Sequence, residues 1–174
     1  MEALVIVDMQ NDFVSKDGAL YFKEARKVIM PIVDLIEEFK DKKAIIITTQ
    51  DWHDREDKEF NKFPPHCIRG TRGSKIIKEI RAALVGYKPW IKIKKTRYSA
   101  FYKTSMDTII KEYKIDRVTV VGVMTNICVL YTVEELRNRD IETYVSKKCV
   151  ATNDDKIQEF TLNQMKDILG VKII

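Results

Sequence analysis

The sequence predicts an α/β fold: a three-layer α/β/α sandwich around a mainly parallel, Rossmann-like sheet of six strands. Short aliphatic, β-branched runs alternate along the chain with longer segments whose apolar residues recur at helical spacing. The first run, residues 3–7, is apolar without a break, which is typical of a strand buried on both faces of a parallel sheet. We therefore expect helices to connect successive parallel strands.

In the first half of the chain, a helix and a second strand follow the first one. Apolar residues recur at helical spacing over residues 28–39, which predicts an amphipathic helix. Residues 44–49 are mostly β-branched and predict a parallel strand, which completes a strand-helix-strand unit. Residues 51–73 contain prolines and glycines among many charges without a sustained period, so we expect a long loop. Long loops are usually functional.

The second half continues the alternation. Ser74 is placed to cap a helix over residues 74–84, and residues 90–93 predict a short strand. Ser105 or Thr104 is placed to cap the next helix, which contains residues 109–113. The remaining elements are strands over residues 118–123, 142–145 and 171–174 and helices over residues 128–139 and 154–168.

Length and composition exclude several classes of protein. A chain of 174 residues with 45% hydrophobic and 33% charged residues is expected to form a single globular domain over residues 1–174. Its apolar runs are far shorter than the ~20 residues of a spanning helix, so we expect no membrane partner. The N-terminus lacks a secretory pattern, so we expect a cytoplasmic protein. The odd cysteine count indicates free thiols at Cys67, Cys128 and Cys149.

The net charge of +5 arises in residues 80–106, which contain no acidic residue. Aromatic residues interleave with the cations over residues 87–103, a pattern that single-stranded nucleic-acid binders use for stacking. However, Ile91 and Ile93 alternate with lysines, which indicates a strand with one solvated face. Because no known nucleic-acid motif accompanies the pattern, we favour the strand and expect no nucleic-acid partner.

Reactive side chains follow several of the predicted strands, at the edge where parallel sheets bind ligands. Asp8, Asp51 and Lys95 lie at or just after strand ends, and Cys128 lies where a helix begins. The helix dipole would lower the pKa of the Cys128 thiol, and a nearby lysine would reinforce this effect. Asp8 is placed to accept the thiol proton, which gives covalent catalysis without histidine. The alternative is that Cys128 only packs in the core.

A second group of side chains has the chemistry of a metal site. Asp51 and His53 point the same way from an extended segment, because they are two residues apart. His66 lies in the same loop and would add a third ligand. Carboxylate and imidazole ligands together suit zinc, manganese or iron. The alternative is an ordinary surface pair, but the chain has only 2 histidines and both lie here.

Three segments together resemble the isochorismatase-like cysteine hydrolases: residues 7–13 (VDMQNDF), 95–101 (KTRYSAF) and 122–129 (GVMTNICV). Their order and spacing match those of the family, and the likeness spans nearly the whole chain. Members of the family commonly self-associate, so the resemblance also allows a homo-oligomer.

The resemblance implies a catalytic triad of Asp8, Lys95 and Cys128. Cys128 would be the nucleophile, Asp8 the proton carrier, and Lys95 would position both. The resemblance also implies a cis peptide bond before Met124, which turns the Met124 N–H toward an oxyanion hole beside the N–H of Cys128. Non-proline cis bonds are rare, so this expectation is specific.

Residues 51–53 and 63–71 look like the metal segment of nicotinamidases. The resemblance then implies that Asp51, His53 and His66 hold one divalent ion, Zn²⁺ or alternatively Mn²⁺ or Fe²⁺, which binds the pyridine nitrogen of nicotinamide. It also implies that the substrate is a small amide whose ring packs against Phe13, Phe63 and Tyr98. Nicotinamidases usually have tryptophan at the position of Phe63, and the family usually has aspartate at that of Asn126. The alternative is therefore a related hydrolase of another small amide, carbamoyl compound or vinyl ether.

Overall fold

Six parallel strands form one sheet in the computed structural model, which describes residues 1–174, and this confirms the predicted α/β fold. The strand order across the sheet is β3-β2-β1-β4-β5-β6. The strands are β1 (Glu2–Val7), β2 (Ile45–Asp51), β3 (Trp90–Lys95), β4 (Arg117–Val123), β5 (Glu142–Ala151) and β6 (Lys172–Ile173).

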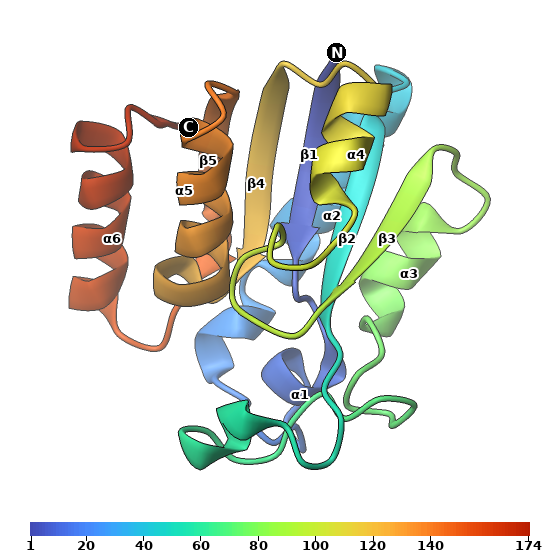
Figure 1. Cartoon of the computed structure of the whole chain (residues 1–174), viewed down its shortest axis with the longest axis vertical. Coiled ribbons are helices and arrows are strands. Elements are labelled where there is room, and N and C mark those ends of the chain that lie inside the picture. Colours follow the sequence, from blue (N-terminus) through green and yellow to red (C-terminus); the bar gives the residue numbers. More distant parts are fainter.

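Helices cover both faces of this sheet (Figure 1). α2 and α3 pack on one face, and α4 and α5 pack on the other, with α6 beside α5. The helices are α1 (Asn11–Val14), α2 (Ile29–Asp41), α3 (Lys78–Leu84), α4 (Met106–Glu112), α5 (Leu130–Arg137) and α6 (Asp155–Asp167). None of them combines the length and the apolar character that a membrane-spanning helix requires.

The unbroken apolar run of β1 reflects burial on both faces of the strand. Ala3, Val5 and Val7 belong to the core under α4, α5 and α6. Leu4 and Ile6 point the other way, into the core under α2 and α3. The strand therefore has no polar face, in agreement with the sequence pattern.

The strand order reverses between β1 and β4. From β1 the chain proceeds outward to β2 and β3, and it then crosses back to place β4 on the other side of β1. Such a switch point opens a crevice at the carboxyl ends of the two central strands, where α/β proteins bind ligands. In Figure 1 this end of the sheet faces α1 and the loop between β2 and α3.

The loop between β2 and α3 differs in detail from the prediction. It contains a short 3-10 turn (Lys58–Asn61), and α3 begins only at Lys78. Ser74 does not cap the helix, because its hydroxyl is buried and donates to the Thr71 carbonyl oxygen at 3.0 Å. Asp154 does cap α6, since its carboxylate accepts from the N–H groups of Lys156 and Ile157.

The aromatic residues of the basic segment do not share one face. Phe101 is buried in the core, and Tyr98 stacks on Tyr131. The Tyr87 hydroxyl donates to the Ala44 carbonyl oxygen at 2.5 Å. The interleaving of aromatic residues and cations therefore has separate structural explanations at separate positions.

β1 and β4 approach each other closely at Gly122, which pairs with Val7 in the register. The φ angle of Gly122 is +114°, a region that residues with a Cβ rarely adopt. A Cβ at this position would also overlap the carbonyl oxygen of Val7. Gly122 therefore allows the two central strands to pair beside the crevice.

We expect Gly122→Ala to destabilise the protein by about 2–6 kcal/mol, because backbone strain and overpacking each cost about 1–3 kcal/mol. Gly86→Ala is the matched control, since Gly86 also has positive φ but has open space around it. The control should lose only about 1 kcal/mol. Urea unfolding measures both values, and equal losses would contradict the steric explanation.

Candidate functional site

Four reactive side chains converge at the carboxyl ends of the central strands. Asp8 directly follows β1, and Asp51 and Lys95 are the last residues of β2 and β3, where they are register partners. Cys128 lies in a π-helical turn (Thr125–Val129) between β4 and α5. The sequence therefore located all four side chains correctly, although Cys128 precedes α5 rather than lying within it.

The Lys95 ammonium group is the centre of this cluster. Its side chain is completely buried, with Nζ 2.7 Å from Asp8 Oδ2 and paired also with Asp51 Oδ1. Nζ donates in addition to Cys128 Sγ at 3.5 Å. A buried ammonium is stable only with such partners, so Lys95 and the two carboxylates depend on one another.

The Asp8 carboxylate is held in one orientation by β2. The Thr49 hydroxyl donates to Asp8 Oδ1 at 2.6 Å, while Asp8 Oδ2 faces Lys95. The backbone of Asp8 has φ +50°, a conformation that costs energy in a residue with a side chain. The strand end thus turns sharply and directs the carboxylate toward Lys95 and Cys128.

The two carboxylates beside Lys95 have different affinities for protons. Burial raises the pKa of Asp8, and the negative charge of Asp51 adds to this, so that Lys95 compensates only in part. Burial also acts on Asp51, but the charge of Lys95 and the neighbouring imidazoles of His53 and His66 hold its pKa well below the usual range. Asp51 therefore stays ionised, and Asp8 is the carboxylate that takes up a proton.

The expected lowering of the Cys128 pKa is wrong for this site. Burial raises the pKa of the thiol, and the charge of Lys95 offsets this only in part. The carboxylates of Asp8 and Asp51 raise it further. Cys128 Sγ and one oxygen of each carboxylate lie within 4.8 Å of one another. Cys128 is therefore a thiol at rest, with a proton acceptor next to it.

A second cluster adjoins the first and consists of Asp51, His53, Glu59 and His66. One nitrogen or oxygen atom of each side chain lies within 4.8 Å of the others, and all four residues are buried. Asp51 Oδ2 is 3.8 Å from His53 Nε2 and 3.7 Å from His66 Nε2. Glu59 Oε1 is 4.0 Å from His66 Nε2.

The donor atoms of this cluster fit a divalent cation. His53 Nε2 and Glu59 Oε2 are buried without any hydrogen-bond partner, which is costly unless a ligand satisfies them. His66 Nδ1 donates to the Pro64 carbonyl oxygen at 2.8 Å, so its Nε2 is available to the cluster. Two imidazoles and two carboxylates suit zinc, manganese or iron.

Glu59 is the member of this cluster that the sequence did not reveal. It lies in the 3-10 turn (Lys58–Asn61), within a segment that contains many charged residues and no regular period. Only the folding of the loop brings its carboxylate to His66. The sequence did not reveal Gln10 either. Its side-chain amide accepts from the Asp51 N–H at 2.8 Å and donates to the Asp51 carbonyl oxygen at 2.9 Å, which requires the end of β2 to lie beside the turn after β1.

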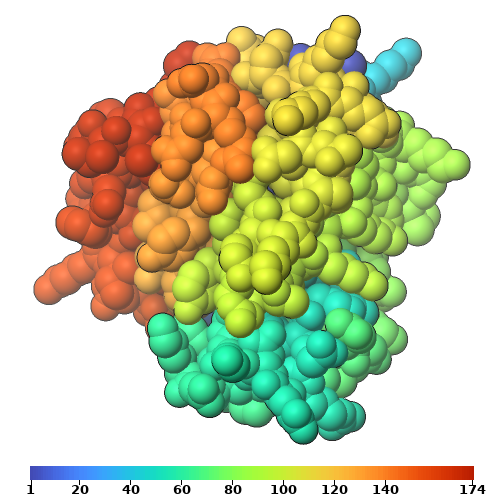
Figure 2. Space-filling view, viewed as in Figure 1, coloured from blue at the N-terminus to red at the C-terminus, as the bar shows by residue number.

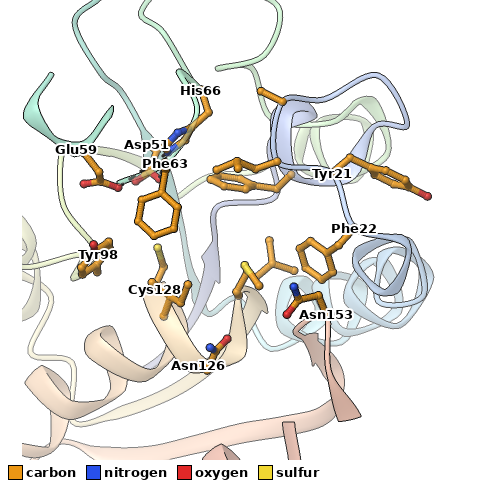
Figure 3. Close-up of a pocket in the computed structure, with 16 residues that line it drawn as sticks. Tyr21, Phe22, Asp51, Glu59, Phe63, His66, Tyr98, Asn126, Cys128 and Asn153 are labelled. Atoms are coloured by element: carbon orange, nitrogen blue, oxygen red, sulfur yellow. Dashed lines mark ion pairs between the residues drawn. The ribbon is translucent and has the colours of Figure 1, made fainter. Parts of the chain in front are cut away.

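Both clusters border one cavity of about 430 Å³ (Figure 3). Its lining includes Cys128 from the first cluster and Asp51, Glu59 and His66 from the second. The three aromatic residues expected at a substrate ring, Phe13, Phe63 and Tyr98, also line it. Tyr21, Phe22, Asn126 and Asn153 line the cavity as well and were not predicted.

The turn after β4 has the expected backbone. The peptide bond between Val123 and Met124 is cis, and Met124 lines the cavity together with Cys128. The segment that carries the thiol therefore borders the same space as the donor cluster.

We expect Lys95→Met to destabilise the metal-free protein by about 3–5 kcal/mol at pH 8, because two buried carboxylates lose their cation. The loss should be smaller at pH 5. The pKa of Asp8 is higher in the folded than in the unfolded chain, so protonation of Asp8 stabilises the folded variant, and this stabilisation is lost as the pH rises. Urea unfolding at both pH values measures the effect.

Lys94→Met is the control for this measurement. Lys94 is exposed on the same strand and lies over the Trp52 ring, 3.9 Å from its centroid. Its replacement should cost at most about 1 kcal/mol at either pH. Similar losses in the two variants would contradict the role given to the buried ammonium group.

Comparison with known proteins agrees with this geometry. The family model described as Isochorismatase domain matches residues 2–173. The relative from Bacillus subtilis named uncharacterized isochorismatase family protein PncA is 31% identical, over 99% of this chain and 98% of its own. The pyrazinamidase/nicotinamidase structure from Streptococcus mutans is 32% identical with a TM-score of 0.95, covering 100% of both chains. The pyrazinamidase of Pyrococcus horikoshii, solved in complex with zinc, is 31% identical with a TM-score of 0.90, covering 99% of this chain and 98% of its own. The chain therefore belongs to the isochorismatase family of hydrolases, as the three sequence segments predict.

Proposed function

We propose that this protein is a metal-dependent nicotinamidase, which hydrolyses nicotinamide to nicotinate and ammonia through a thioester on Cys128. The observation that carries the proposal is that the Cys128 thiol and the donor cluster border the same cavity. A flat pyridine ring with an amide at one end and a nitrogen at the other suits such a cavity. Phe13, Phe63 and Tyr98 supply aromatic walls for the ring.

In the first half of the proposed reaction, Asp8 accepts the thiol proton as Cys128 Sγ attacks the carboxamide carbon. The carbonyl oxygen becomes an oxyanion, which the N–H groups of Met124 and Cys128 stabilise. The intermediate collapses, the C–N bond breaks, and the nitrogen takes the proton from Asp8 and leaves as ammonia. Lys95 keeps its charge throughout and holds the Asp8 carboxylate beside the sulfur.

In the second half, a water molecule hydrolyses the thioester. Asp8 accepts a proton from the water as its oxygen attacks the acyl carbon. The C–S bond then breaks, the sulfur recovers the proton from Asp8, and nicotinic acid leaves and ionises in solution. The raised pKa of Asp8 suits both roles, since the group must bind a proton and release it again near neutral pH.

Asp51, His53, Glu59 and His66 would hold one divalent ion, of which Zn²⁺ is the first candidate and Mn²⁺ and Fe²⁺ are the others. Bound there, the ion supplies a Lewis-acid contact for the ring nitrogen of the substrate. The two histidines must be neutral to bind it, so metal affinity should fall in acid. The zinc complex of the similar Pyrococcus pyrazinamidase supports this assignment.

We expect the purified protein to release ammonia from nicotinamide and Cys128→Ala to release none. Asp8→Asn should lower kcat by about 100- to 10,000-fold, since the proton carrier is lost while the pocket remains. Cys149→Ala is the matched control, because Cys149 is buried in β5 and does not line the cavity. Turnover by Cys128→Ala would contradict the thioester route.

We expect chelation to abolish nicotinamide hydrolysis and one equivalent of Zn²⁺, Mn²⁺ or Fe²⁺ to restore it. His66→Ala should lose activity as fully as Cys128→Ala, because the substrate nitrogen then has no partner. Metal analysis of the purified protein checks the stoichiometry. Turnover without metal would contradict the proposal. It would instead favour a related hydrolase of another small amide or carbamoyl compound, which depends on Cys128 but not on His66.

A further inference from the structure

We infer that Asp57 is a positioning residue for the metal site, and that its single carboxylate orients two of the four ligands. The inference rests on the proposed function only in taking Asp51, His53, Glu59 and His66 as metal ligands. Asp57 itself does not belong to that cluster. It acts through His53 and Glu59, and each of its two oxygens serves one of them.

The first contact fixes the ring of His53. Asp57 Oδ2 lies 3.0 Å from His53 Nδ1, and the His53 side chain is completely buried. A carboxylate at this distance accepts the Nδ1–H and thereby selects the tautomer with a free lone pair on Nε2. Nε2 is the atom that faces Asp51 Oδ2 and has no hydrogen-bond partner of its own. Asp57 therefore directs the vacant donor atom of His53 into the cluster.

The second contact fixes the segment that carries Glu59. Asp57 Oδ1 accepts from the Glu59 N–H at 2.9 Å and caps the 3-10 turn (Lys58–Asn61). The capped turn places Glu59 Oε1 4.0 Å from His66 Nε2. Without the cap, a short turn in an irregular loop has little to hold it.

Arg97 holds Asp57 in this position from the other side. Its Nη1 lies 3.0 Å from Asp57 Oδ1 and 3.3 Å from Oδ2. Arg97 follows β3 by two residues, so the pair joins the strand that ends in Lys95 to the loop of the metal site. Figure 2 shows the segment after β3, in yellow-green, lying against that loop, in teal.

The rings of the two histidines are oriented by different kinds of group, a backbone carbonyl for His66 and a side chain for His53. His66 Nδ1 donates to the Pro64 carbonyl oxygen, a backbone group that no side-chain change removes. His53 depends on a side chain, so Asp57 variants remove the partner of His53 Nδ1 and leave that of His66 Nδ1 in place. Asp54 offers a matched control in the same loop, because its side chain is 72% exposed and pairs only with the exposed Arg69.

The test measures Zn²⁺ affinity of the metal-free protein by competition with a chromogenic chelator. We expect Asp57→Ala to bind Zn²⁺ about 10- to 100-fold more weakly than the unsubstituted protein. Asp57→Asn should show a smaller loss in the same direction, because its amide oxygen still accepts a hydrogen bond but has no charge. Asp54→Asn should stay within about twofold, as surface substitutions do.

The visible absorption of bound Co²⁺ distinguishes a positioning role of Asp57 from a merely structural one. The visible absorption of Co²⁺ reports its ligands, so the band should change in Asp57→Ala and stay unchanged in Asp54→Asn. Zn²⁺ affinities within twofold for both Asp57 variants, or an unchanged Co²⁺ band, would overturn the inference and leave the proposed function intact. An unsubstituted protein that binds neither ion would overturn both. If Asp57→Ala does not fold, the affinity and Co²⁺ band of Asp57→Asn decide the question.

Discussion

A buried ammonium group between two carboxylates determines how the carboxyl edge of this sheet is built. Lys95 ends β3 and reaches across β2 to Asp8, so its charge joins three neighbouring strands. None of the three charged groups could be buried alone, because the desolvation of a single ion costs several kcal/mol. Cys128 contacts the same ammonium group, and Asp51 also belongs to the donor cluster, so both clusters adjoin this arrangement.

Asp51 is the residue that connects the two clusters. One of its oxygens pairs with Lys95, and the other faces the Nε2 atoms of His53 and His66. Because Lys95 keeps Asp51 ionised, the carboxylate presents negative charge to both histidines. For Asp8, burial and the charge of Asp51 outweigh the effect of Lys95, so its pKa is raised. Two chemically identical side chains beside one cation therefore differ, and Asp8 binds a proton more readily than Asp51 does. The cavity therefore has a fixed charge on one side and a proton acceptor beside its thiol.

The sequence predicts the parts of this structure that depend on local pattern. Asp8, Asp51 and Lys95 were found because β-strands are visible as aliphatic runs and their ends are well defined. Glu59 and Asp57 were not found, because their contacts form only when an irregular loop folds over the sheet. Gln10 was not found, because it contacts the backbone of Asp51 in a neighbouring strand. The pKa of Cys128 was predicted in the wrong direction because a sequence shows the helix that follows the thiol but not how deeply the thiol is buried. The N-terminus of α3 was misplaced because the Ser74 hydroxyl found a partner in a turn instead of a helix.

The reversal of strand order between β1 and β4 divides the reactive groups of the site between two parts of the chain. The strands that supply the carboxylates and the ammonium are neighbours, and all of them lie before residue 96. The thiol lies beyond β4 and reaches the site only when β4 pairs with β1. The charged groups and the thiol therefore come from opposite sides of the switch point, and the site is complete only when the two halves of the sheet are joined. Any separation of β1 from β4 would part the sulfur from Asp8 and leave the carboxylates and the ammonium group together.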